Sequence, residues 1–389
     1  MGLGSTKLAK SVRGVGRTLR WWLTALVTPV ARRVPPPPWP LAPASALGQV
    51  VARHVSPSEP IIPPQVYGRV SPPASLLALP RETGQLSVGL TRCEDIVLLG
   101  RDKFISRATG GVLPQSFLSL PDWEAETPGA PMRGLIPAPR LGRQVEHTDQ
   151  PLFSADARWH HFGHTFLEVV PRLMLAADAP PEVQIVTSQK LTRGLMMMGE
   201  MLGIDPARWR RVYYPLHCNV AYLPDMPLQV GTYPHPLARE AFRRIGELGR
   251  QSDISDRPER IFLSRARIDR RKLAEEAAVE ALFAGLGFAV IHPETLPFET
   301  QIALMQGARL VAGLGGSAMH LAVFAPPQAR VLMVSMRDWF ASIDVHLHPA
   351  TGRLGYVFGD AESGHPAVRA RWTVDVNCVE QAAQEHFDI

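Results

Sequence analysis

The chain has 389 residues, with 41 basic and 36 acidic side chains and a formal net charge of +5. Eight of the basic side chains and no acidic one lie in the stretch 1–57, so the remainder is slightly acidic. This distribution excludes a globally basic nucleic-acid-binding domain. A hydrophobic content of 46% excludes a wholly disordered chain. The length predicts two to three domains of about 150 residues each.

The cysteines and the apolar runs indicate in which cellular compartment the protein is expected. The three cysteines, Cys93, Cys218 and Cys378, lie far apart, which excludes a disulfide scaffold and a cysteine-based zinc module and fits a reducing compartment. No apolar run reaches the ~18 residues that a membrane span needs. The stretch Trp21–Val30 follows a basic start, as in a secretory signal, but two arginines and four prolines come soon after it. We therefore expect a cytoplasmic protein.

The N-terminal stretch 1–80 reads as a leader. In residues 7–33, apolar side chains recur every three to four positions with Lys and Arg between them, which predicts a basic amphipathic helix. Such a helix docks on the anionic inner face of a membrane, or it is a solvated leader with no fixed partner. Residues 34–80 hold thirteen prolines, so we expect a disordered or extended linker or wrapping arm there. Ordered structure is expected from about Val88.

Strands and helices alternate from there to Gly249, which predicts an α/β domain with a mainly parallel sheet. Residues 107–150 are rich in Gly, Pro and charge and are expected to be loops or an insertion. The expected strands are Asp95–Leu99, Glu182–Thr187, Trp209–Tyr214 and Cys218–Leu223, with Arg101–Ile105 pairing with the first. The expected helices are His160–Ala177, Leu191–Leu202 and Pro236–Gly249.

A second α/β series follows the polar linker Gln251–Pro258. Gly287 is placed to cap the first of its helices in the left-handed conformation. The expected strands are Arg260–Ser264, Phe288–His292, Arg309–Gly313 and Arg330–Ser335. The expected helices are Leu273–Leu286, Phe298–Gly307 and the short Ser317–Phe324. Residues 351–389 are expected to be a mixed tail that packs back on the body, with one strand, Trp372–Val376.

The first candidate site lies at the start of the His160–Ala177 helix. His160, His164 and Glu168 are four residues apart, so they share one helix face. That face could hold a metal, although the zincin order HExxH is absent. It could also be a polar catalytic face, where a histidine accepts a proton from a hydroxyl nucleophile, or a set of satisfied core histidines.

The second candidate follows the strand that ends in Ser264-Arg265. An arginine there lies at the carboxyl edge of the sheet, where open α/β sheets bind ligands, and a guanidinium grips phosphate with two hydrogen bonds. Arg270, Arg271 and Lys272 come next in the sequence. We expect these three to face solvent, so Arg265 is the predicted anion ligand.

The third candidate is the glycine-rich loop Gly313–His320, between a strand and a short helix. Glycines let backbone N–H groups approach an anion, and a helix start favours negative charge. The stretch Gly313–Ala318 also satisfies the loose dinucleotide pattern GxGxxG/A, with Asp338 about twenty residues on. However, two prolines follow from Pro326, which leaves a short helix for a dinucleotide crossover. A tight turn with no ligand is the remaining interpretation.

Together these pieces resemble glycosyltransferase family 61, especially its bacterial members linked to capsular or surface polysaccharide. His161–Leu173 is similar to the family's element NYGHWLLEVLPRL. The similarity continues in order through Leu263-Ser264-Arg265, Glu275-Glu276, Gly287-Phe288, Pro293-Glu294-Thr295-Leu296, Gln301, Gly313–His320 and Phe324–Pro327. It covers about residues 155–335.

The sequence also departs from the family pattern. The family's loop is often HGAGLTN, and here Gly315 stands for its His and Leu321 for its Asn. Thr300 stands where an acid usually precedes Gln301, and Glu275 where an Asn is usual. These departures leave the identity of the donor sugar open.

The resemblance implies two Rossmann-like domains of the GT-B type. Residues 81–245 would bind the acceptor, residues 246–350 the donor nucleotide, with a leader over 1–80 and a tail over 351–389. It implies an inverting, metal-independent hexosyl- or pentosyltransferase that needs no cofactor beyond its nucleotide-sugar donor. His164 or Glu168 would deprotonate the hydroxyl of a glycan acceptor. The donor would contact Ser264, Arg265, Glu294, Gly315, Gly316, Ser317 and His320.

Three alternatives stay open on the sequence. An NAD(P)-dependent oxidoreductase would use the loop Gly313–Ala318 with Asp338. A metal hydrolase would use His160, His164 and Glu168. A non-catalytic membrane-associated adaptor would depend on residues 7–33 alone.

Overall fold

The computed structural model describes residues 48–100, 103–108, 113, 145–157, 159–213, 215–228, 233–348, 353–362 and 370–389. The expected helix over 7–33 lies outside these residues. The chain divides into two compact units. Unit 1 comprises residues up to His54, Val88–His160 and Arg172–Met226; unit 2 comprises Val55–Ser87, His161–Pro171 and Pro227–Ile389. In the described part of the chain, no helix has the length and apolarity to cross a membrane.

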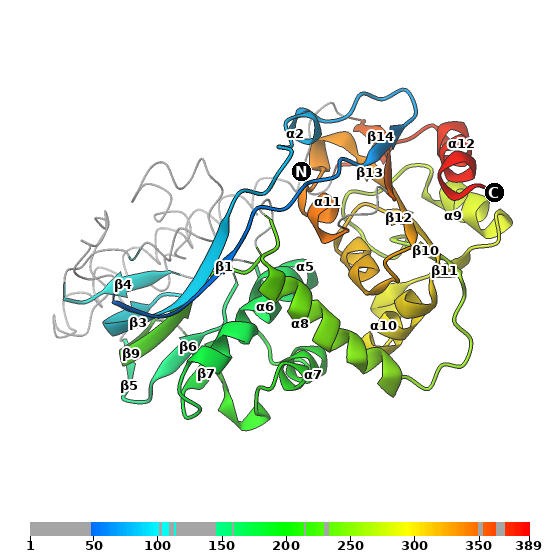
Figure 1. Ribbon diagram of the computed structural model, residues 1–389. Coiled ribbons are helices and arrows are strands. Elements are labelled where there is room, and N and C mark those ends of the chain that lie inside the picture. The colour runs from blue at the N-terminus through cyan, green and yellow to red at the C-terminus, as the bar shows by residue number, and fades with distance from the viewer. Residues whose placement is uncertain are drawn as a thin grey trace, which may run out of the picture. The chain divides into compact units, whose positions relative to one another are not determined.

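Unit 1 is built on a mixed sheet with the strand order β1-β3-β9-β6-β7-β8 (Figure 1). Its strands are β1 (Gln49–Ser56), β3 (Leu86–Leu98), β4 (Phe104–Ser106), β5 (Glu146–Thr148), β6 (Leu152–Ser154), β7 (Gln184–Thr187), β8 (Trp209–Arg211) and β9 (Leu216–Pro224). Its helices are η6 (Leu173–Asp178), α7 (Arg193–Met201) and η7 (Pro206–Arg208).

The sheet of unit 1 is parallel on one side and antiparallel on the other. Strands β9, β6, β7 and β8 are parallel, as expected. Strand β3, however, runs antiparallel to β9 and to β4. The sequence predicts only the end of β3, because Glu94 and Asp95 interrupt its apolar pattern. Asp95 takes a left-handed φ of 53°, and the ladder to β9 skips this residue.

Unit 2 is built on a largely parallel sheet. Its strands are β2 (Gln65–Tyr67), β10 (Arg260–Leu263), β11 (Ala289–Ile291), β12 (Leu310–Leu314), β13 (Arg330–Met336), β14 (Leu354–Ala361) and β15 (Trp372–Thr373). Its helices are α2 (Ala74–Leu77), α5 (Phe162–His164), η5 (Thr165–Val169), α6 (Val170–Arg172, the last residue grouped with unit 1), α8 (Pro236–Gly246), η8 (Glu247–Gln251), α9 (Glu276–Gly285), η9 (Pro293–Thr295), α10 (Phe298–Gly307), η10 (Ser317–Phe324), η11 (Arg337–Trp339), α11 (Ile343–Leu347) and α12 (Val376–Phe387).

The strand order of unit 2 fixes where a ligand can bind. The order is β11-β10-β12-β13-β14, all parallel, with β2 parallel beside β14 and the short β15 antiparallel to it. After β10, the chain adds β11 on one side of it and then returns to add β12 on the other side, so the switch point of the strand order lies between β10 and β12. Doubly wound sheets bind ligands at such a switch point, beyond the carboxyl ends of the strands.

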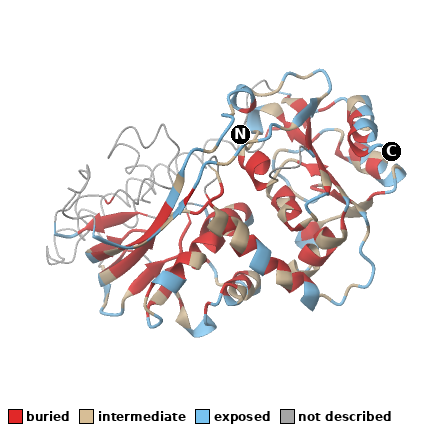
Figure 2. Ribbon diagram, in the orientation of Figure 1, coloured by how far each residue is buried: buried red, intermediate tan, exposed pale blue. Residues whose placement is uncertain are grey.

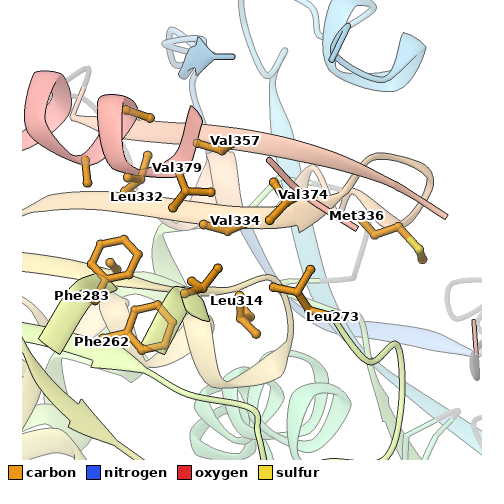
Figure 3. Close-up of a cluster of buried hydrophobic side chains, with 14 of the residues drawn as sticks. Phe262, Leu273, Phe283, Leu314, Leu332, Val334, Met336, Val357, Val374 and Val379 are labelled. Carbon is orange, nitrogen blue, oxygen red and sulfur yellow. The ribbon is translucent and has the colours of Figure 1, made fainter. Parts of the chain in front are cut away.

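Alternate residues of these strands point to opposite faces of the sheet. On one face, Phe262, Leu332 and Val334 pack against α9 and α12 through Phe283 and Val379, as Figure 3 shows. On the other face, Gly313 lies against Met319 of η10. Because both faces of the sheet are covered, the sequences of its strands are nearly continuous apolar runs. Figure 2 shows buried residues along the strands of both sheets.

Most elements predicted for unit 2 are present, but several others are missed. The tail was expected to hold one strand, yet it contributes β14, which lies between β13 and β2, and the twelve-residue helix α12. In the described part of the proline-rich segment, Gln49–Ser56 form β1, Gln65–Tyr67 form β2 and Ala74–Leu77 form the short helix α2, all before the expected start of ordered structure at Val88. Residues His161–Pro171, assigned by the sequence to the N-terminal domain, group with unit 2.

Candidate active site

The predicted helix begins at Phe162 and contains a wide π-helical turn, η5, over Thr165–Val169. Pro171, just after this turn, has no N–H to donate to the carbonyl of Leu167, and this favours the irregular geometry. Such turns are frequent at functional sites. Nδ1 of His164 lies 2.8 Å from Oε2 of the buried Glu168. Both atoms are buried, and among the described residues neither has a well-directed hydrogen bond, so the pair is a close contact.

Aromatic packing fixes this helix in unit 2. The Phe166 ring stacks on Phe242 at 4.8 Å between centroids and meets Phe324 edge-on at 5.8 Å. Phe162 stacks on Phe166 at 5.5 Å. At Gly163, an added Cβ would lie 2.6 Å from Oγ of Ser317 and 3.6 Å from Nε2 of His320. Glycine therefore lets the helix approach the glycine-rich loop.

The glycine-rich loop leaves the sheet at the end of β12. The Gly315 N–H donates to the carbonyl of Val334, which ties the loop to β13. A Cβ on Gly316 would collide with the guanidinium of Arg265. The loop then enters η10, which carries Ser317 and His320. The glycines are therefore needed for close approach of neighbouring groups.

His320 forms a second carboxylate–imidazole pair. Its Nδ1 lies 2.8 Å from Oδ1 of Asp344 on α11, and both side chains are buried. Because Nδ1 faces the carboxylate, the Nε2 atom is the one turned toward Gly163. Two more polar groups lie in the field of Asp344, and burial lowers the pKa of His348 to about 4 and raises that of Tyr356. Among described residues, His348 Nε2 and the Tyr356 hydroxyl have no hydrogen-bond partner.

Arginines converge on the other side of the loop. Arg265 donates from Nη1 to the carbonyl of Gly315 at 3.3 Å and from Nη2 to that of Arg270 at 3.1 Å. Burial lowers the pKa of Arg265. Burial, then the charges of Arg265 and Arg270, lower the pKa of Arg271 to about 10. No ion pair within the described residues neutralises these guanidiniums. A buried cation without an ion-pair partner is costly, so this place favours an anion.

The comparison with protein families agrees with this geometry. Residues 162–332 match the model of the family described as Glycosyltransferase 61. The chain carries a glycosyltransferase 61 region. A match to this family implies glycosyltransferase activity, and with it a sugar donor and an acceptor. The region runs from the first residue of α5 into β13 and holds every base and donor-binding residue that the resemblance implies. No curated protein matches the chain significantly.

Within the glycosyltransferase 61 region, the structure brings together most of the predicted residues. His164, Glu168, Gly315, Gly316, Ser317, His320 and Arg265 surround the loop. Two predicted donor ligands lie elsewhere. The Ser264 hydroxyl is buried, donates to Glu280 and accepts from the N–H of Ala266, so these hydrogen bonds are structural. Glu294 is exposed in η9, next to the end of β11.

The proposed metal face is not assembled. His160 Nε2 lies 3.1 Å from Oδ1 of Asp156 and 3.1 Å from Oγ of Ser188, all in unit 1, while His164 pairs with Glu168 in unit 2. Over the described residues, no group of three or more His, Cys, Asp or Glu could hold a metal ion. The helical face was broken because the regular helix starts only at Phe162, so four-residue spacing does not extend back to His160.

Sequence reasoning missed three residues near the loop. Arg271 was expected in solvent, but it is half-buried, and its guanidinium lies 5.0 Å from the centre of the Trp339 ring. Asp344 and Trp339 lie beyond the family match. The one available sequence signal was the predicted strand β13. It is parallel to β12, so the residues that follow it reach the same sheet edge as the loop.

Proposed function

We propose that the chain transfers a sugar from a nucleotide-sugar donor to a hydroxyl of a glycan acceptor, with inversion at the anomeric carbon and without a metal. The observation that carries this proposal is the meeting, at the switch point of one sheet, of Arg265, the loop Gly313–His320 and the His164–Glu168 pair. An anion site beside a candidate base is what single-displacement sugar transfer requires.

In this mechanism the acceptor oxygen attacks the anomeric carbon as the bond from that carbon to the diphosphate oxygen breaks. The bonding electrons leave with the nucleoside diphosphate. The hydroxyl proton passes to His164 or Glu168. Arg265 and the backbone N–H groups of the loop stabilise the negative charge that grows on the departing diphosphate, which is an electrostatic role. His320 contacts the phosphate or the donor sugar rather than serving as the base.

The decisive experiment is a screen of nucleotide sugars with the purified full chain. We expect one donor class to be hydrolysed or transferred, with activity unaffected by EDTA and with an inverted product by NMR. Arg265→Ala should weaken binding of the matching nucleoside diphosphate by about tenfold or more, since hydrogen bonds to charged groups contribute about 1.5–3 kcal/mol. Arg267→Ala, which changes an exposed arginine of the same loop, is the matched control. Unchanged affinity in Arg265→Ala would exclude this anion site.

Two further parts of the proposal depend on sequence. The acceptor belongs to surface polysaccharide biosynthesis, and residues 7–33 bring the enzyme to the anionic inner face of the plasma membrane. We expect the full chain to sediment with phosphatidylglycerol vesicles and not with phosphatidylcholine vesicles. Deletion of residues 7–33 should abolish this binding and leave donor binding intact. Equal sedimentation of the deleted form would refute the membrane role of this segment.

A further inference from the structure

Trp339 is an exposed aromatic residue at the edge of unit 2 that the predicted site does not use. It ends η11, directly after β13, and 37% of its surface is exposed. Strand β13 is the parallel neighbour of β12, from which the glycine-rich loop leaves. Trp339 therefore follows a strand whose carboxyl end lies at the same edge of the sheet as the loop.

The turn that carries Trp339 is anchored on both sides. Arg337 Nη2 lies 3.1 Å from Oδ1 of Asp360 on β14. The Phe340 ring packs edge-on against Tyr356 and Phe358, at 5.5 and 6.1 Å between centroids. Because Arg337 and Phe340 are held on either side of it, the indole is presented from a fixed turn. A preorganised aromatic surface loses little freedom when a flat ligand stacks on it.

Arg271 links the Trp339 indole to the anion site. Its guanidinium carbon lies 5.0 Å from the centre of the Trp339 ring, and a terminal nitrogen lies 3.5 Å from the Cβ position of Gly316. The backbone of Arg271 is left-handed, with a φ of 50°, a conformation that costs free energy in a residue other than glycine. The C-terminal segment holds it there, because the Trp372 indole N–H donates to the Arg271 carbonyl at 2.8 Å.

We propose that Trp339 is the stacking platform for the nucleobase of the nucleoside diphosphate. Arg271 holds the phosphates beside Gly316, and the ring that follows them along the sheet edge lies on the indole. This inference rests on the proposed function and adds a subsite to it. Stacking tolerates every base, since each has a π-face, so the platform secures a nucleotide and leaves the choice of base to other contacts.

The test separates the nucleobase from the diphosphate. Binding of UDP, GDP, CDP, ADP and inorganic pyrophosphate is measured by calorimetry for the full chain and for Trp339→Ala and Trp339→Phe. We expect Trp339→Ala to weaken the best-bound nucleoside diphosphate by about tenfold or more and pyrophosphate by less than about twofold. Trp339→Phe keeps a ring and should retain most of the affinity.

Tyr213→Ala is the matched control. Tyr213 is exposed and has Arg211 over its ring at 5.4 Å, the same pairing as Trp339 with Arg271, but it lies in unit 1. It should leave all affinities unchanged. Unchanged nucleoside diphosphate affinity in Trp339→Ala overturns the platform, as does an equal loss for pyrophosphate, which would mean that Trp339 only supports Arg271. A loss confined to the intact nucleotide sugar also overturns it. If the unaltered chain binds no nucleoside diphosphate, the proposed function fails as well.

Discussion

Two imidazoles in unit 2 each face a carboxylate through Nδ1, and they differ in their surroundings. His320 meets Asp344 in a buried hydrogen bond, beside other buried polar groups. His164 meets Glu168 in a close contact with no well-directed hydrogen bond, and its side chain keeps 18% of its surface exposed. The partly exposed, less constrained imidazole of His164 is better placed to take a proton from an incoming hydroxyl, whereas the fixed imidazole of His320 is suited to binding the donor.

We therefore predict different kinetic losses for the two pairs. His164→Ala should lower kcat by about 10²- to 10⁴-fold, the usual contribution of a general base, with little change in nucleoside diphosphate affinity. Asp344→Asn should mainly raise KM for the donor, because it leaves His320 in place but removes the carboxylate that orients it. Steady-state kinetics and calorimetry check both. The opposite pattern would make His320 the base.

The lowered pKa of Arg271 leads us to expect that anion binding depends on pH. Its pKa is lowered to about 10, first by burial and then by the neighbouring charges of Arg265 and Arg270. Below that pH the guanidinium is charged and attracts the diphosphate, and above it the charge is lost. Pyrophosphate affinity should therefore fall as pH rises through about 10. Arg271→Ala should show lower affinity and a flatter profile, and Arg267→Ala should follow the unaltered chain.

Several site residues could be predicted from sequence because their signal is local. His164 and Glu168 share a helix turn, and Gly315, Gly316 and Arg265 follow predicted strands. Asp344 could not be predicted, because it lies 24 residues beyond His320 and reaches it only through the folding of α11. Arg271 is held by a hydrogen bond from the distant Trp372 to its carbonyl, so the local sequence could not separate it from Arg270.

At the scale of the element, the site helix is held by its apolar neighbours. Phe166 lies between His164 and Glu168 in sequence and is fully buried among Phe242, Phe298 and Phe324. This packing, rather than helix propensity, explains why a short segment with a π-turn and a proline is ordered in unit 2.

Phe166→Ala should lower the free energy of unfolding by about 3–5 kcal/mol, the usual cost of removing a buried phenyl ring. It should also reduce activity, because the His164–Glu168 turn loses its support. Phe166→Leu keeps most of the volume and should cost less than about 1.5 kcal/mol. Urea denaturation checks both values. An unchanged midpoint for Phe166→Ala would show that other contacts position the helix.

The elements that were not predicted show where the local sequence does not reveal a strand or helix. Strand β14 reads LGYVFGDA, where two glycines weaken the strand pattern, and its place in the sheet comes from partners on both sides. One partner, β2, comes from a proline-rich segment near the other end of the chain. Helix α12 has a local signal that could have been used, since Asp375 caps it by accepting from the Asn377 and Cys378 N–H groups.

At the scale of the whole molecule, each unit is assembled from distant stretches of chain. Unit 2 takes β2 from residues 65–67, the site helix from His161–Pro171 and its sheet from Pro227 onward. The predicted boundaries at 80, 245 and 350 are consecutive cuts and cannot describe such interleaving. The ends of unit 2 are joined by a contact of the Tyr67 hydroxyl with Nδ1 of His386 at 3.1 Å.

Two buried histidines of unit 2 make stability sensitive to acid. Burial lowers the pKa values of His346 and His386 to about 4, against about 6.5 in an unfolded chain. Below about pH 6.5 the unfolded chain therefore binds protons at these histidines, whereas the folded chain binds them only near pH 4. Stability is thus complete above about pH 6.5 and falls between the two values. The difference is about 2.5 pKa units, so at roughly 1.4 kcal/mol per unit the protonation of each histidine lowers the stability by up to about 3.5 kcal/mol once the pH falls to about 4.

Urea midpoints measured at pH 7, 6, 5 and 4.5 should therefore decrease steadily. His386→Asn cannot titrate, so its midpoint should fall less steeply with acid, even if its stability at pH 7 is lower because the contacts with Tyr67 and the Arg353 carbonyl are weakened. His54→Asn is the matched control, since His54 pairs with Asp178 near the surface of unit 1 and has no such burial. Parallel pH profiles for His386→Asn and the unaltered chain would show that this histidine does not link stability to pH.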